Sequence, residues 1–232
     1  MIKNYGVLSQ VEEKDLKLLE ENPVEFWKDV YEIGNGAFSY LKIKEIEIPG
    51  KVFSIGHGAF AECYNLKKVV LHRGLKFIDY GAFSNCEKLK DITLPDTIIG
   101  IDEFAFEATA ITYIHIPEGV QMLDCAVFSY CYSLEEVYLP QSLEEIDVRA
   151  FEMCSSLKKV VMCSTTKYSA DIFEDCPHVQ IIKYNPTKQN TINQPKQEKQ
   201  ISKSEYKRKQ EAKQKIDDLF NEIFNKCEGR DI

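Results

Sequence analysis

Apolar residues recur along the chain at a fixed spacing. A phenylalanine, preceded in most copies by alanine, stands at Phe38, Phe60, Phe83, Phe106, Phe128, Phe151 and Phe173. Five residues earlier lies a second apolar column, made of Ile33, Ile55, Ile78, Ile101, Leu123, Ile146 and Tyr168. Three residues after the phenylalanine, five copies carry Cys63, Cys86, Cys131, Cys154 or Cys176. Columns that stay in phase over seven copies indicate a repeat protein with a period of 22 or 23 residues.

Downstream of each phenylalanine, alternating apolar and polar residues predict a short strand with one buried face. Leu66, Val69 and Leu71 show the pattern Leu-x-x-Val-x-Leu, and the first and fourth copies are one residue shorter before it. Such strands need neighbours, so we expect them to stack as a parallel sheet about 4.8 Å apart. The Gly-Ala-Phe-x-x-Cys segment is predicted to turn tightly. The residues that end in the isoleucine column are predicted to form a second short strand.

The repeating unit, seen cleanly from Ile78 to Pro95, resembles the BspA-type leucine-rich repeats of bacterial and protist proteins. The resemblance covers about residues 32–184. It implies a mainly β leucine-rich-repeat solenoid of seven turns of 22–23 residues, with short helical turns between parallel strands. It also implies a binding or adhesion module, of a kind often displayed on cell surfaces.

The ends of a solenoid need a cover, and residues 1–31 are predicted to supply it as a helical N-terminal cap. Ser9 to Glu12 fits a capping box, and Leu16, Leu19, Val24, Phe26 and Trp27 supply an apolar surface. A docking helix for a partner is the alternative interpretation of this segment.

Residues 185–201 are polar and are predicted to form a flexible linker. Residues 202–228 are predicted to form an amphipathic C-terminal helix. Its apolar stripe consists of Ile216, Leu219, Phe220, Ile223 and Phe224. Two interpretations stay open: a cap that folds back, or a helix that binds a partner or mediates weak self-association.

Charge argues against a nucleic-acid partner. The net charge is −8. Residues 1–185 carry 18 Lys and Arg against 29 Asp and Glu, whereas residues 186–232 carry 11 against 8. An acidic body lacks the basic face on which binding to a polyanion depends. The polar N-terminal sequence contains no apolar run that could serve as a signal peptide or membrane span, so we expect a cytoplasmic protein with reduced thiols.

Motifs for chemistry are absent from the sequence, so we expect no enzyme activity, no cofactor and no metal. The four histidines stand in no zinc-binding frame. The segments Gly34-Asn35-Gly36 and Gly56-His57-Gly58 resemble phosphate-binding glycines, but each precedes Ala-Phe at the same place in its repeat, where a tight turn explains the glycine. The cysteine column is predicted to fill the core, with weak hydrogen bonds to the backbone of the turns.

Strand residues that alternate with the core face outward and are free to bind a partner. One predicted outward column runs along Glu47, Val70, Thr93, His115, Tyr138, Val161 and Lys183. The next runs along Glu45, Lys68, Asp91, Tyr113, Glu136, Lys159 and Ile181. The predicted partner-binding site on this concave sheet comprises Val70, Tyr113, His115, Glu136, Tyr138 and Val161. Ordinary cross-strand stacking on a solvated sheet is the alternative.

The sequence thus favours a non-enzymatic scaffold that binds a protein or peptide through its concave sheet. The alternative function is an adhesin-like module that interacts with a cell surface or host, exported by an unrecognised route.

Overall fold

The computed structural model describes residues 1–4 and 6–186. The chain divides into two units, Met1–Thr187 and Lys188–Ile232, and the described residues belong to the first. The predicted C-terminal helix, with its stripe of Ile216, Leu219, Phe220, Ile223 and Phe224, therefore lies outside the described residues, as does almost all of the predicted linker.

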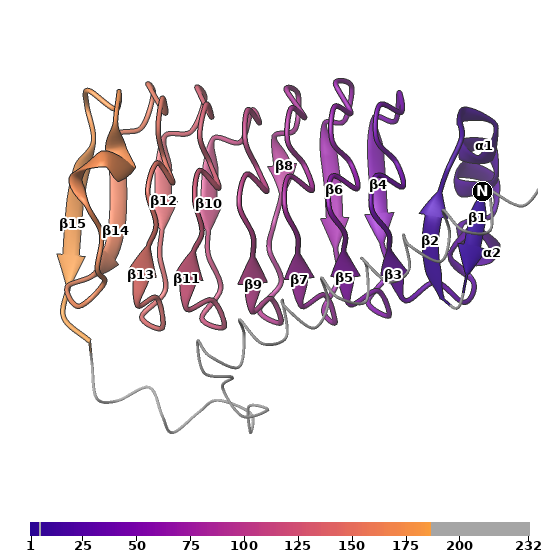
Figure 1. Ribbon diagram of the computed structural model, residues 1–232, viewed down its shortest axis with the longest axis horizontal. Helices are drawn as coiled ribbons and strands as arrows, with labels where there is room; N and C mark the ends of the chain where they lie inside the picture. Colours follow the sequence, from indigo (N-terminus) through magenta and orange to yellow (C-terminus); the bar gives the residue numbers. More distant parts are fainter. Residues whose placement is uncertain (5, 187–232) are drawn as a thin grey trace, which may run out of the picture. The chain divides into compact units, whose positions relative to one another are not determined.

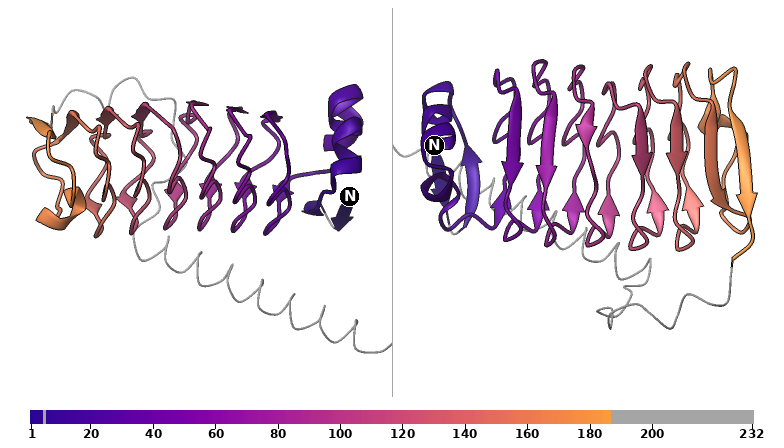
Figure 2. Two further views of the ribbon diagram at one scale, coloured as in Figure 1. Left: turned by 90° about the horizontal axis from the view of Figure 1, so that it is seen from above. Right: turned by 180° about the vertical axis from the view of Figure 1, so that it is seen from behind.

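Each turn of the first unit except the last contributes two short strands, the last contributes one, and consecutive turns lie side by side in sequence order (Figures 1 and 2). The outward strands are β4 (Glu45–Ile48), β6 (Lys68–Leu71), β8 (Asp91–Ile92), β10 (Tyr113–His115), β12 (Glu136–Tyr138), β14 (Lys159–Cys163) and β15 (Gln180–Tyr184). The second set comprises β3 (Glu32–Ile33), β5 (Ser54–Ile55), β7 (Phe77–Ile78), β9 (Gly100–Ile101), β11 (Met122–Leu123) and β13 (Glu145–Ile146). All of these pairings are parallel, as predicted for a leucine-rich-repeat fold.

Alternation in the outward strands separates core from surface. In β4, Ile46 and Ile48 are buried while Glu45 and Glu47 are exposed. The outward ladder is interrupted once: β4, β6 and β8 form one sheet, and β10, β12, β14 and β15 form another. The interruption coincides with the fourth copy, which is one residue short and has Thr109 where five copies have cysteine.

The phenylalanine column forms a continuous ring stack through the core. Six consecutive pairs, from Phe38 to Phe173, have ring centroids 4.8–5.7 Å apart and interplanar angles of 2–17°. At the N-terminal end, Phe26 and Trp27 each lie 6.2 Å from the Phe38 ring. The stacked rings therefore make the hydrophobic core continuous between consecutive turns.

Left-handed residues shape the turn around each phenylalanine. The residue two positions after it has φ of 51–64° in every copy: Tyr40, Glu62, Asn85, Ala108, Tyr130, Met153 and Asp175. The residue two positions before it is also left-handed in six copies: Gly36, Gly58, Gly81, Phe104, Ala126 and Arg149. This geometry confirms the tight turn for Gly36 and Gly58, and it shows that later copies accept side chains in the same conformation. Gly34 and Gly56 are not left-handed; a Cβ there would lie 3.1 Å from the Leu8 carbonyl oxygen and 2.8 Å from that of Ile33, respectively.

Glycine should therefore be favourable at this position throughout the solenoid. Gly81→Ala is expected to lower the free energy of unfolding by about 1–2 kcal/mol, since the left-handed conformation is strained for an L-residue. A Cβ at Gly81 would meet only Ser84 at 3.7 Å, so the cost is conformational rather than steric. Arg149→Gly, at an exposed residue with φ 57°, should raise the free energy of unfolding by up to about 1 kcal/mol. Urea denaturation of both variants measures the difference, and a loss of stability in both would contradict the argument.

The N-terminal segment differs from the predicted helical cap. It opens with a hairpin of β1 (Ile2–Asn4) and β2 (Val7–Gln10), and β2 pairs in parallel with β3. Ser9 lies in β2, so the predicted capping box at Ser9 was wrong. This segment forms a strand and not the start of a helix because Leu8 is fully buried and its carbonyl oxygen accepts a hydrogen bond from the Gly34 N–H at 2.8 Å.

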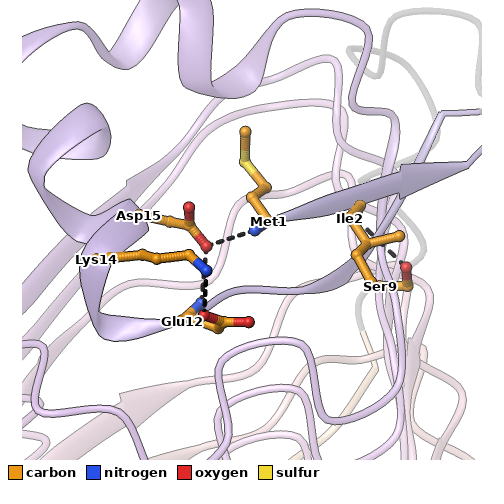
Figure 3. A network of polar contacts seen from close by, with 6 residues as sticks. All are labelled: Met1, Ile2, Ser9, Glu12, Lys14 and Asp15. Atoms are coloured by element: carbon orange, nitrogen blue, oxygen red, sulfur yellow. Dashed lines mark hydrogen bonds and ion pairs between the residues drawn. The ribbon is translucent and has the colours of Figure 1, made fainter.

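Helical structure follows the hairpin, as η1 (Glu13–Asp15), α1 (Leu16–Glu21) and α2 (Pro23–Trp27). The Glu12 N–H donates to Asp15 Oδ2 at 2.9 Å, and Lys14 Nζ lies 2.6 Å from Glu12 Oε2 (Figure 3). Phe26 and Trp27 are buried as expected, whereas Val24 is largely exposed.

The last turn corrects the predicted outward columns. Lys159 pairs with Gln180, and Val161 pairs with Ile182, so the columns end in Gln180 and Ile182 rather than in Ile181 and Lys183. Like the first and fourth copies, the last turn is one residue short: β15 follows η2 (Ala170–Phe173) one residue earlier than the sequence pattern suggested.

Candidate protein-binding surface

Three adjacent strands, β10, β12 and β14, bring most of the predicted site together. In their parallel register Tyr113 lies beside Glu136, and Glu136 beside Lys159. In the next row His115 lies beside Tyr138, and Tyr138 beside Val161. We call Tyr113, His115, Glu136, Tyr138, Lys159 and Val161 the aromatic cluster.

Tyr138 is at the centre of this cluster. Its ring centroid lies 5.3 Å from that of Tyr113, with the planes tilted by 47°, and 6.5 Å from that of His115. Tyr113 remains 51% exposed, and His115 is also exposed. Large apolar area is therefore held at the surface next to groups that can form hydrogen bonds.

Polar contacts fix the Tyr138 ring in place. Its hydroxyl donates to Glu136 Oε2 at 2.8 Å and accepts from Lys159 Nζ at 2.5 Å. Lys159 Nζ also lies 3.3 Å from Glu136 Oε2 and 4.8 Å from the centroid of the Tyr138 ring. Each of these three residues thus contacts the other two.

The same contacts shift the pKa values of the charged partners. Hydrogen bonds from Tyr138 and Lys159 lower the pKa of Glu136. Hydrogen bonds with Tyr138 and Glu136 raise the pKa of Lys159. Both groups therefore keep their charge across the neutral range, and the ring keeps its support.

Lys159 was not among the predicted site residues, although its place beside Glu136 in the outward column was a signal for it. Val70 lies apart from the cluster, because β6 belongs to the sheet on the other side of the interruption. The row of Tyr138 and Val161 continues instead to Ile182, which is 47% exposed.

A second pair of exposed aromatic residues lies beside the other set of strands. Tyr31 and Phe53 occupy the same repeat position, seven residues before the phenylalanine column, and the Phe53 N–H donates to the Tyr31 carbonyl oxygen at 2.9 Å. Both residues lie outside the two predicted outward columns, so the alternation in the strands after the phenylalanines carries no signal for them.

The cysteine column is confirmed as core. Each thiol donates to the carbonyl oxygen of the phenylalanine in the preceding turn, at 2.9–3.1 Å: Cys63, Cys86, Cys131, Cys154 and Cys176. Burial raises the pKa of Cys63 to about 12 and that of Cys131 to about 11. At neutral pH the thiols of Cys63 and Cys131 are therefore protonated and poorly nucleophilic.

Thiol reactivity should follow this arrangement. Iodoacetamide at pH 8 is expected to modify Cys125, which is partly exposed, long before Cys63 or Cys131. Burial and the nearby Glu103 and Asp147 raise the pKa of Cys125 too, so it should react more slowly than a free thiol. Peptide mass spectrometry of native and urea-unfolded protein measures the order. Labelling of the column thiols at the rate of Cys125 in the native state would disprove their burial.

Within residues 1–4 and 6–186, no group of three or more His, Cys, Asp or Glu side chains could hold a metal ion. In the same part of the chain, no helix is long and apolar enough to cross a membrane.

The model of the BspA type leucine-rich repeat region matches residues 19–88 and 53–180, in six copies. Comparison with curated proteins yields no match.

Solved structures with the same fold include several bacterial repeat proteins. A leucine-rich repeat protein from Bacteroides ovatus is 33% identical, with a TM-score of 0.63, and the match covers 68% of this chain and 42% of that one. The Treponema pallidum leucine-rich repeat protein is 28% identical, with a TM-score of 0.58 and coverage of 66% and 73%. A leucine-rich cell surface protein from Faecalibacterium prausnitzii is 24% identical, with a TM-score of 0.52 and coverage of 69% and 52%. The chain thus spans less than half the length of the Bacteroides protein.

Proposed function

Because the chain belongs to the BspA-type leucine-rich-repeat family, we propose that it is a non-enzymatic module that binds a protein or peptide through its outward strands. More specifically, we propose that the protein is a scaffold that binds its partner through the aromatic cluster. Residues 1–31 are proposed to cover the N-terminal end of the core. The C-terminal segment 202–228 is proposed as a second contact.

One observation carries the proposal: Tyr138 is fixed by Glu136 and Lys159 while Tyr113 stays half exposed beside it. Exposed tyrosines contribute much of the binding energy in protein interfaces, since they bury large area with few rotatable bonds. A ring that is already held loses little conformational entropy when a partner binds. The fixed ring of Tyr138 therefore favours binding to a partner protein more than a flexible side chain would.

An affinity purification tests the scaffold role and separates it from the adhesin-like alternative. The bait is the full chain, compared with a chain that ends at residue 184. The scaffold role predicts stable recovery of a cytosolic protein, with weaker recovery by the shorter bait. Retention on cell envelope or host matrix, with no cytosolic partner, would contradict the scaffold and favour the adhesin-like module. The cytoplasmic location stays a prediction, which fractionation of the native cell would test.

A further inference from the structure

Three lysines lie at the N-terminal ends of the strands in the first outward sheet. Lys44 directly precedes β4, Lys67 precedes β6 and Lys90 precedes β8. The Lys67 N–H donates to the Lys44 carbonyl oxygen at 2.7 Å, and the Lys90 N–H donates to that of Lys67 at 3.1 Å. Their backbones are therefore neighbours in consecutive turns, at a strand spacing of about 4.8 Å. We call these three residues the lysine ladder.

The charges of the lysine ladder are not neutralised by ion pairs in the part of the chain that the structure describes. All three side chains are exposed, and none forms an ion pair with another described residue. Lys68 is different, because the parallel register places it between Glu45 and Asp91. Like charges that face one another across strands are unfavourable, so folding alone does not account for the ladder.

Two further lysines extend the basic surface. Lys42 and Lys88 are exposed and lie two residues before Lys44 and Lys90. Lys88 Nζ donates to Asn65 Oδ1 at 2.9 Å, which places Lys88 beside the preceding turn. Five exposed lysines thus stand on three consecutive turns.

Charge is distributed unevenly along the solenoid. Residues 32–96 carry 9 Lys and Arg against 8 Asp and Glu, a net charge of +1. Residues 97–163 carry 3 against 11, a net charge of −8. The lysine ladder lies in the first of these segments, next to turns that repel anions.

We propose that the lysine ladder binds a short acidic segment of a partner protein. Three strands span only about 10 Å at the usual strand spacing, which matches a few consecutive carboxylates. A polynucleotide or an anionic membrane would extend beyond the ladder over turns with a net charge of −8, where it would be repelled. An acidic peptide can end where the lysines end.

The site is separate from the aromatic cluster. The lysine ladder borders the sheet of β4, β6 and β8, whereas the aromatic cluster lies on β10, β12 and β14, across the interruption. The acidic-segment proposal and the proposed function can therefore fail independently.

Binding of a fluorescein-labelled hexaglutamate peptide to the full chain, followed by anisotropy at low ionic strength, tests the proposal. The ladder variant carries Lys44→Gln, Lys67→Gln and Lys90→Gln. The control variant makes the same change at three exposed lysines elsewhere, Lys17, Lys51 and Lys167. Both variants lose three positive charges, so net charge alone cannot distinguish them.

The proposal predicts that the ladder variant binds the peptide at least about tenfold more weakly, and the control within about twofold of the wild type. Added salt should weaken wild-type binding. The melting temperature of the ladder variant should not fall, because like-charge repulsion is removed. Three results would overturn the proposal: no binding by the wild type, equal losses in both variants, or tighter binding of a single-stranded oligonucleotide or of phosphatidylserine vesicles.

Discussion

Phe106→Ala is expected to lower the free energy of unfolding by about 3–5 kcal/mol. Phe106 is fully buried in the central turn, and its ring stacks on Phe83 and Phe128, both at 5.4 Å. Truncation removes the buried ring area and leaves a cavity in the middle of the stack. The neighbouring rings cannot close this cavity without moving the turns to which they belong. Urea denaturation monitored by circular dichroism measures the loss.

His115→Ala on the same turn is the control for this variant. His115 is exposed and contacts Tyr138 only at a ring distance of 6.5 Å. Its removal should change the free energy of unfolding by no more than about 0.5 kcal/mol. Similar losses in the two variants would mean that the assignment of core and surface is wrong.

Val160→Asp should destabilise the protein by more than about 4 kcal/mol, enough to abolish a cooperative transition if the wild type is marginally stable. Val160 is fully buried in β14 between Val137 and Ile181 in the parallel register. A carboxylate there has neither water nor a basic partner, so it must remain protonated or open the core. Val160→Thr gives a graded version, expected to cost about 1–3 kcal/mol for the buried hydroxyl.

Val161→Asp places the same side chain one residue further along the same strand, on the outward face. Its cost should stay near 1 kcal/mol, since the carboxylate is solvated and only strand propensity is lost. The ratio between the two aspartate variants reports the alternation of faces directly. If Val161→Asp were the more damaging change, the register of β14 would be wrong.

Repetition explains why the core could be predicted. Phe106 and Ile101 recur in equivalent form in neighbouring copies, so each copy supports the assignment of the others. The end of the solenoid lacks this support. Ile181 and Ile182 are both apolar, so alternation could not decide which of them faces inward, and pairing with Val160 and Val161 settles it.

The N-terminal hairpin could not be predicted by the same reasoning, because it stands outside the repeat. Residues 2–4 and 7–10 are short and partly polar, and β2 is stabilised by pairing with β3 rather than by its own pattern. A capping box at Ser9 was a reasonable local signal, but the tertiary pairing prevailed.

The candidate site was predictable in its location but not in its contacts. Alternation placed Tyr113 and Tyr138 outward, and the structure brings their rings together. The hydrogen bonds of Glu136 and Lys159 to Tyr138 depend on side-chain rotamers, which a repeat pattern does not contain. The separation of Val70 from the cluster depends on the interrupted ladder, which coincides with the shortened fourth copy but does not follow from the alternation of apolar and polar residues.

The most direct test of the proposed function is the affinity of the recovered partner for the double variant Tyr113→Ala with Tyr138→Ala. The matched control removes two exposed tyrosines outside the strands, Tyr40 and Tyr132. We expect a loss of affinity of at least about 30-fold for the cluster variant, as is typical when interface anchors are truncated, and a change within about twofold for the control. An unchanged affinity for the cluster variant, or equal losses in the two variants, would contradict binding through the aromatic cluster.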